Sequence, residues 1–255
     1  GYGWDFSFNT CLLREYDKEE KQEVGMILKD GDGSFHRFPL TENGEYDSAK
    51  GTLMRLEHDE ENGEYTITRK DNIVYHFDEN SMKLLRFSNP NGNELEFAYD
   101  ERGNLKSVKN TVGEEIILTY NTAQENPRSE DYIYKNDHVD MLKTVSWTQS
   151  ASDEPKSIVY HYEYNDKDKL TKAYTLIEGN DEYAESFTYD EDNELSAITN
   201  PENNTYALLC TNGKIDKVTD PVGNDMLLRY FSGKTVVMDQ NGAASSYIFD
   251  GEGRV

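Results

Sequence analysis

Hydrophobic and polar residues alternate along short stretches of this chain, and clusters of turn residues separate the stretches. Between residues 94 and 99, for example, Leu95, Phe97 and Tyr99 fall on one face of an extended segment. Residues 116–120 are rich in the β-branched and aromatic side chains that strands favour. Helical periodicity is not convincing anywhere in the chain. The pattern therefore predicts an all-β protein.

One motif returns along the chain at intervals of roughly twenty residues. A typical copy begins with an aromatic residue and Asp, passes through turn residues, and then carries Leu or Ile followed three residues later by Val or Ile. The units begin at Phe77, Tyr99, Tyr164, Tyr189, Cys210, Tyr230 and Phe249. A repeat of this length predicts one supersecondary unit stacked on itself, and such arrays usually serve as scaffolds or binding surfaces.

The residues between the strands have the chemistry of hairpin turns. Asp-x-x-Gly and Asn-x-x-Gly spacings supply Gly or Asn where a turn needs a positive φ. One hairpin cannot bury its apolar face alone, so we expect antiparallel β-hairpin repeats joined edge to edge into a continuous curved ribbon. The residues expected to seal the apolar side of this wall are Leu105, Val108, Leu195, Ile198, Ile215 and Val218.

The chain is expected to have two parts. Residues 1–70 should form an N-terminal antiparallel β segment, and residues 71–255 should hold the repeats, with a loop insertion near 122–140. Hairpin signals in the first part lie at Asp30–Gly33, Asn43–Gly44 and Asn62–Gly63. Because the last repeat is cut off, we expect the chain to be a piece of a longer protein. The lack of a visible signal peptide then says little about location.

Composition narrows the possible partners and compartments. The 255 residues include 50 acidic and 26 basic side chains, for a net charge of −24, which disfavours nucleic acid and anionic membrane surfaces. No apolar run approaches the ~18 residues of a spanning helix, so membrane insertion by this segment is not expected. Two cysteines are too few for a disulfide framework. Cys210 stands where other copies carry an aromatic residue, so we expect a buried apolar thiol.

The sequence carries no motif that favours catalysis or metal binding. The histidines, none of them at zinc spacing, are His36, His58, His76, His138 and His161. Asp30–Gly33 and Asn165–Asp168 resemble the start of calcium loops but lack the required Gly and Glu further along. No serine-hydrolase, phosphate-loop or dinucleotide motif is present. We expect no catalytic residue, cofactor or metal; a glycoside-active enzyme would need one carboxylate pair held in a cleft.

The tandem motif resembles the YD repeat of bacterial Rhs and wall-associated proteins. Tyr99–Val108 carries the core Tyr-Asp-x-x-Gly-x-Leu-x-x-Val, and the opening Gly3–Asn9, followed by Asp30–Phe38, is similar to the segment before those repeats. Copies at Tyr164, Cys210 and Tyr230 lack the Asp. The resemblance implies a β-ribbon that spirals into a hollow shell. Such shells enclose a variable C-terminal toxin in Rhs proteins and in the BC component of insecticidal toxin complexes, and teneurins use a similar shell in adhesion.

From this resemblance we expect a structural shell fragment that encloses or displays a C-terminal toxin in bacterial competition. Its partners would be the rest of its own polypeptide, including the toxin domain, and it would be secreted or displayed on the bacterial cell surface. Asp220–Gly223 is similar to the start of the Asp-Pro-x-Gly-Leu motif at which Rhs shells cleave themselves. Asn224 stands where that motif has Leu, so we predict an ordinary turn.

The alternative is a carbohydrate-binding or cell-surface adhesion module, because exposed aromatic faces stack on pyranose rings. Tyr132, Tyr134 and Trp147 are the best candidates for binding cell-surface glycans. Alternating aromatics also pack between neighbouring strands, and this structural role is the simpler explanation for the same residues. Both interpretations place the function on a surface and not in a reaction centre.

Overall fold

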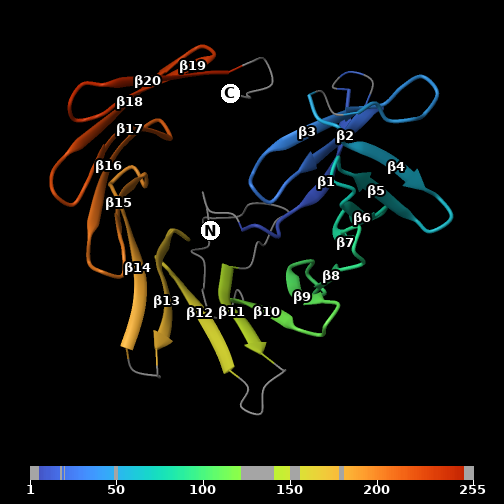
Figure 1. The fold of residues 1–255 in the computed structure, drawn as a ribbon, viewed down its shortest axis with the longest axis horizontal. Helices are drawn as coiled ribbons and strands as arrows, with labels where there is room; N and C mark the ends of the chain where they lie inside the picture. The colour runs from blue at the N-terminus through green and yellow to red at the C-terminus, as the bar shows by residue number, and fades with distance from the viewer. Residues whose placement is uncertain are drawn as a thin grey trace. The chain divides into compact units, whose positions relative to one another are not determined.

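The computed structural model describes residues 6–17, 19, 21–48, 51–121, 141–149, 156–177 and 181–249 (Figure 1). In these residues the regular structure consists of twenty β-strands. The same ranges hold no helix, and so none long and apolar enough to cross a membrane. By its internal contacts the chain divides into two compact units, residues 1–159 and 160–255.

Unit 1 begins with a small sheet of its own. Its three antiparallel strands lie in the order β1 (Cys11–Tyr16), β2 (Glu23–Lys29) and β3 (Phe35–Pro39). The predicted turn at Asp30–Gly33 joins β2 to β3, and the Asp30 amide donates to the Ser34 carbonyl at 2.9 Å. The prediction of a hairpin turn at Asp30–Gly33 is confirmed.

The rest of unit 1 is a ribbon of hairpins in which each strand pairs antiparallel with the next. Its strands are β4 (Arg55–Asp59), β5 (Glu64–Thr68), β6 (Val74–Asp78), β7 (Leu84–Ser88), β8 (Glu94–Tyr99), β9 (Leu105–Asn110), β10 (Glu115–Asn121) and β11 (Met141–Gln149). The expected division into two domains at residue 70 stays a prediction. Strands β4 and β5, which precede residue 70, pair within this ribbon. The expected loop insertion at 122–140 lies outside the described residues.

Unit 2 continues the same hairpin pattern. Its strands, the first of which begins at the end of unit 1, are β12 (Lys156–Tyr164), β13 (Leu170–Ile177), β14 (Asp181–Tyr189), β15 (Leu195–Thr199), β16 (Thr205–Thr211), β17 (Lys214–Thr219), β18 (Asp225–Phe231), β19 (Lys234–Met238) and β20 (Ala244–Ile248). Each pairs antiparallel with the following strand. The structure confirms the predicted fold class, an all-β ribbon of antiparallel hairpins.

A single turn geometry recurs between the strands, and Asp100 shows how it is built. The Gly103 amide donates to the Asp100 carbonyl at 2.9 Å, and the Asp100 carboxylate accepts from the amides of Arg102 at 3.0 Å and Asn104 at 2.8 Å. Burial acts to raise the pKa of Asp100, but the hydrogen bonds from Asn104, Arg102 and Gly103 outweigh it and hold that pKa below its usual value. Gly103 takes a φ of 85°, which explains the glycine of the motif.

The same turn is built on Asn or Asp at several other places along both ribbons. The residues in the position of Asp100 are Asn89, Asn110, Asn165, Asp190, Asn200, Asp220 and Asp239. Asn193 takes the place of Gly103 in its hairpin with a φ of 62°, a conformation that Asn tolerates better than most residues. The prediction of an ordinary turn at Asp220–Gly223 is confirmed.

In several units the first aromatic bonds to the preceding hairpin through its hydroxyl. Tyr99 lies opposite Leu105 beside a bulge, and its hydroxyl donates to the Leu84 carbonyl at 2.9 Å. Equivalent bonds join Tyr120 to Leu105, Tyr189 to Leu170 and Tyr230 to Ile215, each at 2.8 Å. In these places the tyrosine hydroxyl therefore links one hairpin to the one before it.

Candidate functional site

Each ribbon has two faces with different roles. We define the tyrosine face as the one that carries the first aromatic of each unit, and the opposite face as the other side of the same strands. Directly paired residues share a face, so Phe97 and its partner Val108 lie on the tyrosine face, whereas Glu96 and its partner Lys109 lie on the opposite face.

In unit 1 the small sheet β1–β3 covers the tyrosine face of the ribbon. Leu12, Met26, Leu28 and Phe38 of the small sheet share one buried cluster with the ribbon residues Met54, Leu56, Tyr65, Ile67, Phe77, Leu84, Phe97, Leu105, Val108 and Leu118. Burial of this many large apolar side chains is the main source of stability for unit 1. Of the predicted wall residues, Leu105 and Val108 are only 5% and 3% exposed.

Specific contacts fix the small sheet on the ribbon. The Leu12 amide donates to the Met82 carbonyl at 2.9 Å, and the Arg14 guanidinium donates to the Glu79 carbonyl at 3.2 Å. The rings of Phe8 and Phe97 meet edge to face with centroids 5.8 Å apart, a favourable aromatic geometry. The cover is therefore held by main-chain bonds as well as by apolar packing.

In unit 2 the tyrosine face is buried at Leu170 and Phe187, which are 6% and 5% exposed, and it is open to solvent from β15 onward within the described residues. Leu195, Ile198, Ile215 and Val218, predicted to seal the wall, are only half-buried. On the same face Tyr206 and Met226 are each 40% exposed. Monomeric proteins seldom expose contiguous apolar patches of this kind unless they bind something. This open tyrosine face is the candidate functional site.

Cys210 corrects one expectation from the sequence. Its thiol was expected to be buried, but the residue is half-exposed because it lies on the open tyrosine face of unit 2. Its Sγ atom donates to the Leu195 carbonyl at 3.2 Å and so occupies the position of the tyrosine hydroxyl in other units. Partial desolvation raises the pKa of the thiol, as do the nearby carboxylates, Glu194 foremost. The thiol thus has a structural contact and a lowered tendency to ionise.

Of the three aromatics proposed for sugar stacking, the structure describes Trp147. It lies in β11 directly opposite Ile116, half-buried on the tyrosine face of unit 1. This cross-strand pairing is the packing role expected of an aromatic in a sheet. Tyr132 and Tyr134 lie outside the described residues. Sugar binding by these residues stays a prediction.

A polar cluster on the opposite face of unit 1 was not predicted from the sequence. The Arg86 guanidinium donates to both carboxylate oxygens of Glu64, at 2.9 and 2.8 Å, and the His76 Nδ1 atom lies 3.0 Å from Glu64. The bonds from Arg86, followed by that from His76, outweigh burial and lower the pKa of Glu64. Alternation along β6 and β7 could have placed His76 and Arg86 on a polar face. Only the strand register, however, shows that both lie beside Glu64.

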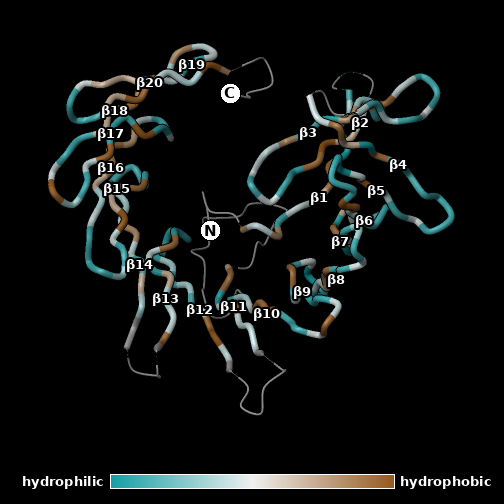
Figure 2. Tube along the Cα trace, in the orientation of Figure 1, coloured by the Kyte–Doolittle hydropathy of each residue, from teal (hydrophilic) through white to brown (hydrophobic). Residues whose placement is uncertain are grey.

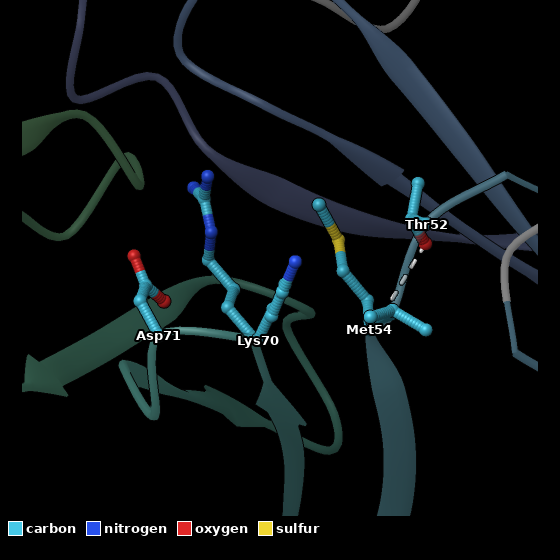
Figure 3. A pocket seen from close by; sticks show the side chains of 6 residues that line it. Thr52, Met54, Lys70 and Asp71 are labelled. Atoms are coloured by element: carbon cyan, nitrogen blue, oxygen red, sulfur yellow. Dashed lines mark hydrogen bonds between the residues drawn. The ribbon is translucent and has the colours of Figure 1, made fainter.

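A shallow pocket of about 380 Å³ lies between the loop before β4 and the turn from β5 to β6 (Figure 3). Its lining residues are Thr52, Leu53, Met54, Arg69, Lys70 and Asp71. Arg69 is held by the Tyr75 hydroxyl at 3.1 Å, and the Thr52 hydroxyl accepts from the Met54 amide at 3.3 Å. The lining offers neither a nucleophile paired with a base nor a set of metal ligands, which gives the pocket no evident chemistry.

The two sequences that resemble calcium loops are turns in the structure. The Asp32 carboxylate accepts from the Ser34 amide at 2.8 Å, and its bonds to Ser34 lower its pKa. The Asn165 side chain accepts from the amides of Lys167 and Lys169, both at 3.0 Å. Among the described residues no group of three His, Cys, Asp or Glu side chains is placed to hold a metal ion. These oxygens therefore serve turn geometry.

Comparison with known proteins gives one kind of match. No family model and no curated protein matches the chain. A crystal structure of TcdB2-TccC3-Cdc42 superposes with a TM-score of 0.41 at 11% identity, over 94% of this chain and 15% of that chain. The Tc holotoxin pore of Photorhabdus luminescens gives a TM-score of 0.41 at 12% identity, with the same two shares.

A porin-like protein from Bacteroides uniformis gives a TM-score of 0.32 at 11% identity, over 83% of this chain and 94% of that one. The chain thus spans 15% of the length of the TcdB2-TccC3 structures it matches first. Likeness at these TM-scores assigns the chain neither a family nor a function. The functional argument rests on the chain's own faces.

Proposed function

We propose that this chain is a wall segment of a YD-repeat shell, and that the tyrosine face of unit 2 packs against another part of the same polypeptide. The observation that carries the proposal is the difference in burial between matched repeat positions. Leu105 is buried beneath the small sheet, whereas Leu195, at the same place in its unit, is half-exposed. The repeat is built to have its tyrosine face covered, and from β15 onward the described residues leave it open.

Unit 1 supports the choice of the same polypeptide as the cover. There the covering sheet β1–β3 belongs to this chain and is held by bonds such as that from the Leu12 amide to the Met82 carbonyl. A partner in the same polypeptide binds at high effective concentration, so an apolar surface of modest affinity suffices. The open face is therefore suited to a segment that is tethered to it.

The finer parts of the proposal come from the sequence resemblance at Tyr99–Val108. The tethered segment would be a C-terminal toxin that the shell encloses or displays, in a protein secreted by a bacterium or carried on its cell surface. The chain would act by containment, with the turns setting the hairpins and the apolar face forming the wall. We propose no catalytic role for any of its residues.

Two neighbouring residues provide the test, because Leu208 lies on the tyrosine face and Leu209 on the opposite face of β16. A photo-cross-linking amino acid would replace each in turn in the purified full-length polypeptide. We expect position 208 to cross-link to a segment outside the repeats, which peptide mass spectrometry would identify, and position 209 to give far less of this product. Equal yields at both positions, or no product at 208, would contradict the proposal.

A further inference from the structure

The opposite face differs between the two ribbons as much as the tyrosine face does. In unit 1 it is polar, and a row of directly paired residues crosses it from β5 to β10. The members of the row are Thr66, His76, Arg86, Glu96, Lys109 and Glu115. Charges of both signs alternate along this row, as is usual on a solvated face.

In unit 2 the opposite face of β16–β20 carries large apolar side chains among its polar ones. Direct pairing places Leu227 beside Met238, and Lys234 between Phe231 and Ile248. Phe231 and Ile248 are 62% and 67% exposed, and Leu209 on the same face is 54% exposed. Hydrophobic stretches follow β18 to β20 in Figure 2. Strands with apolar residues on both faces are normally covered on both sides.

The charges on this face are mainly positive, although the chain as a whole is strongly acidic. Lys217, Arg229 and Lys234 lie there with Asp225. Asp225 is 3.4 Å from the Lys217 ammonium. The Arg229 guanidinium donates to the Leu228 carbonyl at 2.9 Å, and within the described residues no ion pair reaches Arg229 or Lys234. Two cations without carboxylate partners are unexpected in a chain with 50 acidic and 26 basic residues.

We propose that the opposite face of β16–β20 binds a partner polypeptide that presents apolar side chains interspersed with carboxylates. The apolar side chains would cover Phe231 and Ile248, and the carboxylates would pair with Arg229 and Lys234. Aromatic and arginine side chains at the centre of an apolar patch are the usual anchors of a protein interface. Because this surface lies on the side of the strands away from the tyrosine face, binding there would be a function additional to the proposed wall role.

Charge argues against two other partners for this face, a second copy of the chain and an anionic membrane. A second copy using the same face would bring two surfaces of the same net positive charge together, and like charges across an interface are costly. An anionic membrane would present a charged plane to the whole chain, whose net charge is −24. A polypeptide can instead place single carboxylates at the two cations, where short-range pairing outweighs the more distant repulsion.

The test uses a labelled short peptide in which Glu alternates with Leu and Val, and a matched peptide with Lys in place of Glu. Fluorescence anisotropy would measure their binding to the full chain. We expect the acidic peptide to bind about tenfold more tightly than the basic one, and Phe231→Ser and Lys234→Glu each to weaken its binding about tenfold. Ile117→Ser and Lys106→Glu, in unit 1, and Met226→Ser, on the tyrosine face, should leave its binding unchanged.

Circular dichroism and urea unfolding would show that the variants fold, and Ile248→Ser would replace Phe231→Ser if that variant does not. Equal binding of the two peptides, or undiminished binding by the face variants, would overturn the proposal. It would also be overturned by binding to phosphatidylglycerol vesicles in place of the peptide, or by a dimer that Phe231→Ser dissociates. Loss of peptide binding in Met226→Ser alone would assign the peptide to the tyrosine face instead.

Discussion

The ribbons of unit 1 and unit 2 are made of the same hairpin but differ in what lies against them. Leu105 and Leu195 follow the same turn, pair with the same tyrosine of their own unit and offer their carbonyls to the next unit. One is buried beneath the small sheet and the other is half-exposed. Local sequence therefore determines the hairpin, whereas its burial depends on which distant segment covers it.

The largest expected effect comes from truncating these two leucines. Leu105→Ala removes a buried side chain and leaves a cavity, so it should lower the free energy of unfolding by about 3 kcal/mol. Leu195→Ala should cost only about 1 kcal/mol, because water already reaches the side chain. Urea unfolding of both variants and the parent chain gives the comparison. Equal losses would mean that the two tyrosine faces are equally covered.

The charged cluster on the opposite face of unit 1 should make stability depend on pH. Arg86 lowers the pKa of Glu64 in the folded chain. The Glu64 carboxylate therefore stabilises the fold above its unfolded pKa of about 4.3, and this stabilisation is lost as the pH falls through the lower pKa of the folded chain. Glu64→Gln should cost about 1 to 2 kcal/mol near neutral pH, and the cost should shrink in acid.

The matched control for this prediction is Glu57→Gln. Glu57 lies on the same face and pairs with Arg55, but both side chains are exposed, so its loss should change stability by well under about 1 kcal/mol. Urea unfolding at a series of pH values would show the difference. A cost for Glu64→Gln that stays constant into acid would refute the account of the cluster.

The hydrogen bonds that tyrosine hydroxyls make between units should also contribute differently to the free energy of unfolding in the two ribbons. Tyr99→Phe would leave the Leu84 carbonyl without its donor in a buried site, at a cost of about 1 kcal/mol. Tyr230→Phe should cost about half as much or less, since Tyr230 is exposed and water can replace its hydroxyl at the half-buried Ile215. Hydrogen exchange and urea unfolding would report both changes, and a larger loss for Tyr230→Phe would reverse the comparison.

The smallest expected effect is a gain. Cys210→Tyr should restore the hydroxyl bond to the Leu195 carbonyl that its repeat position is built to make, and it adds a ring to the tyrosine face. We expect the free energy of unfolding of unit 2 to rise by about 0.5 kcal/mol. Cys210→Ser, which keeps a short polar donor, is the control. Destabilisation by the tyrosine would show that this unit departs from the common geometry.

Much of the fold could be predicted because its determinants are local. The Asp100–Gly103 turn sets the β8–β9 hairpin, and the alternation of Leu95, Phe97 and Tyr99 sets its faces. The cover on Leu105 could not be predicted, because it depends on Leu12 and other residues far away in the sequence. The bond between Glu64 and Arg86 likewise depends on register across three strands. The open tyrosine face of unit 2, which is the candidate site, was missed for the same reason.

Hydroxyl-radical footprinting of the chain tests the central claim most directly, because oxidation of a side chain follows its contact with water. Residues on the two tyrosine faces would be quantified by mass spectrometry, with Phe97 and Leu118 for unit 1 and Tyr206 and Met226 for the open part of unit 2. After correction for intrinsic reactivity, we predict that the unit 1 residues are protected and the unit 2 residues are oxidised readily. Equal protection on the two faces would contradict the account.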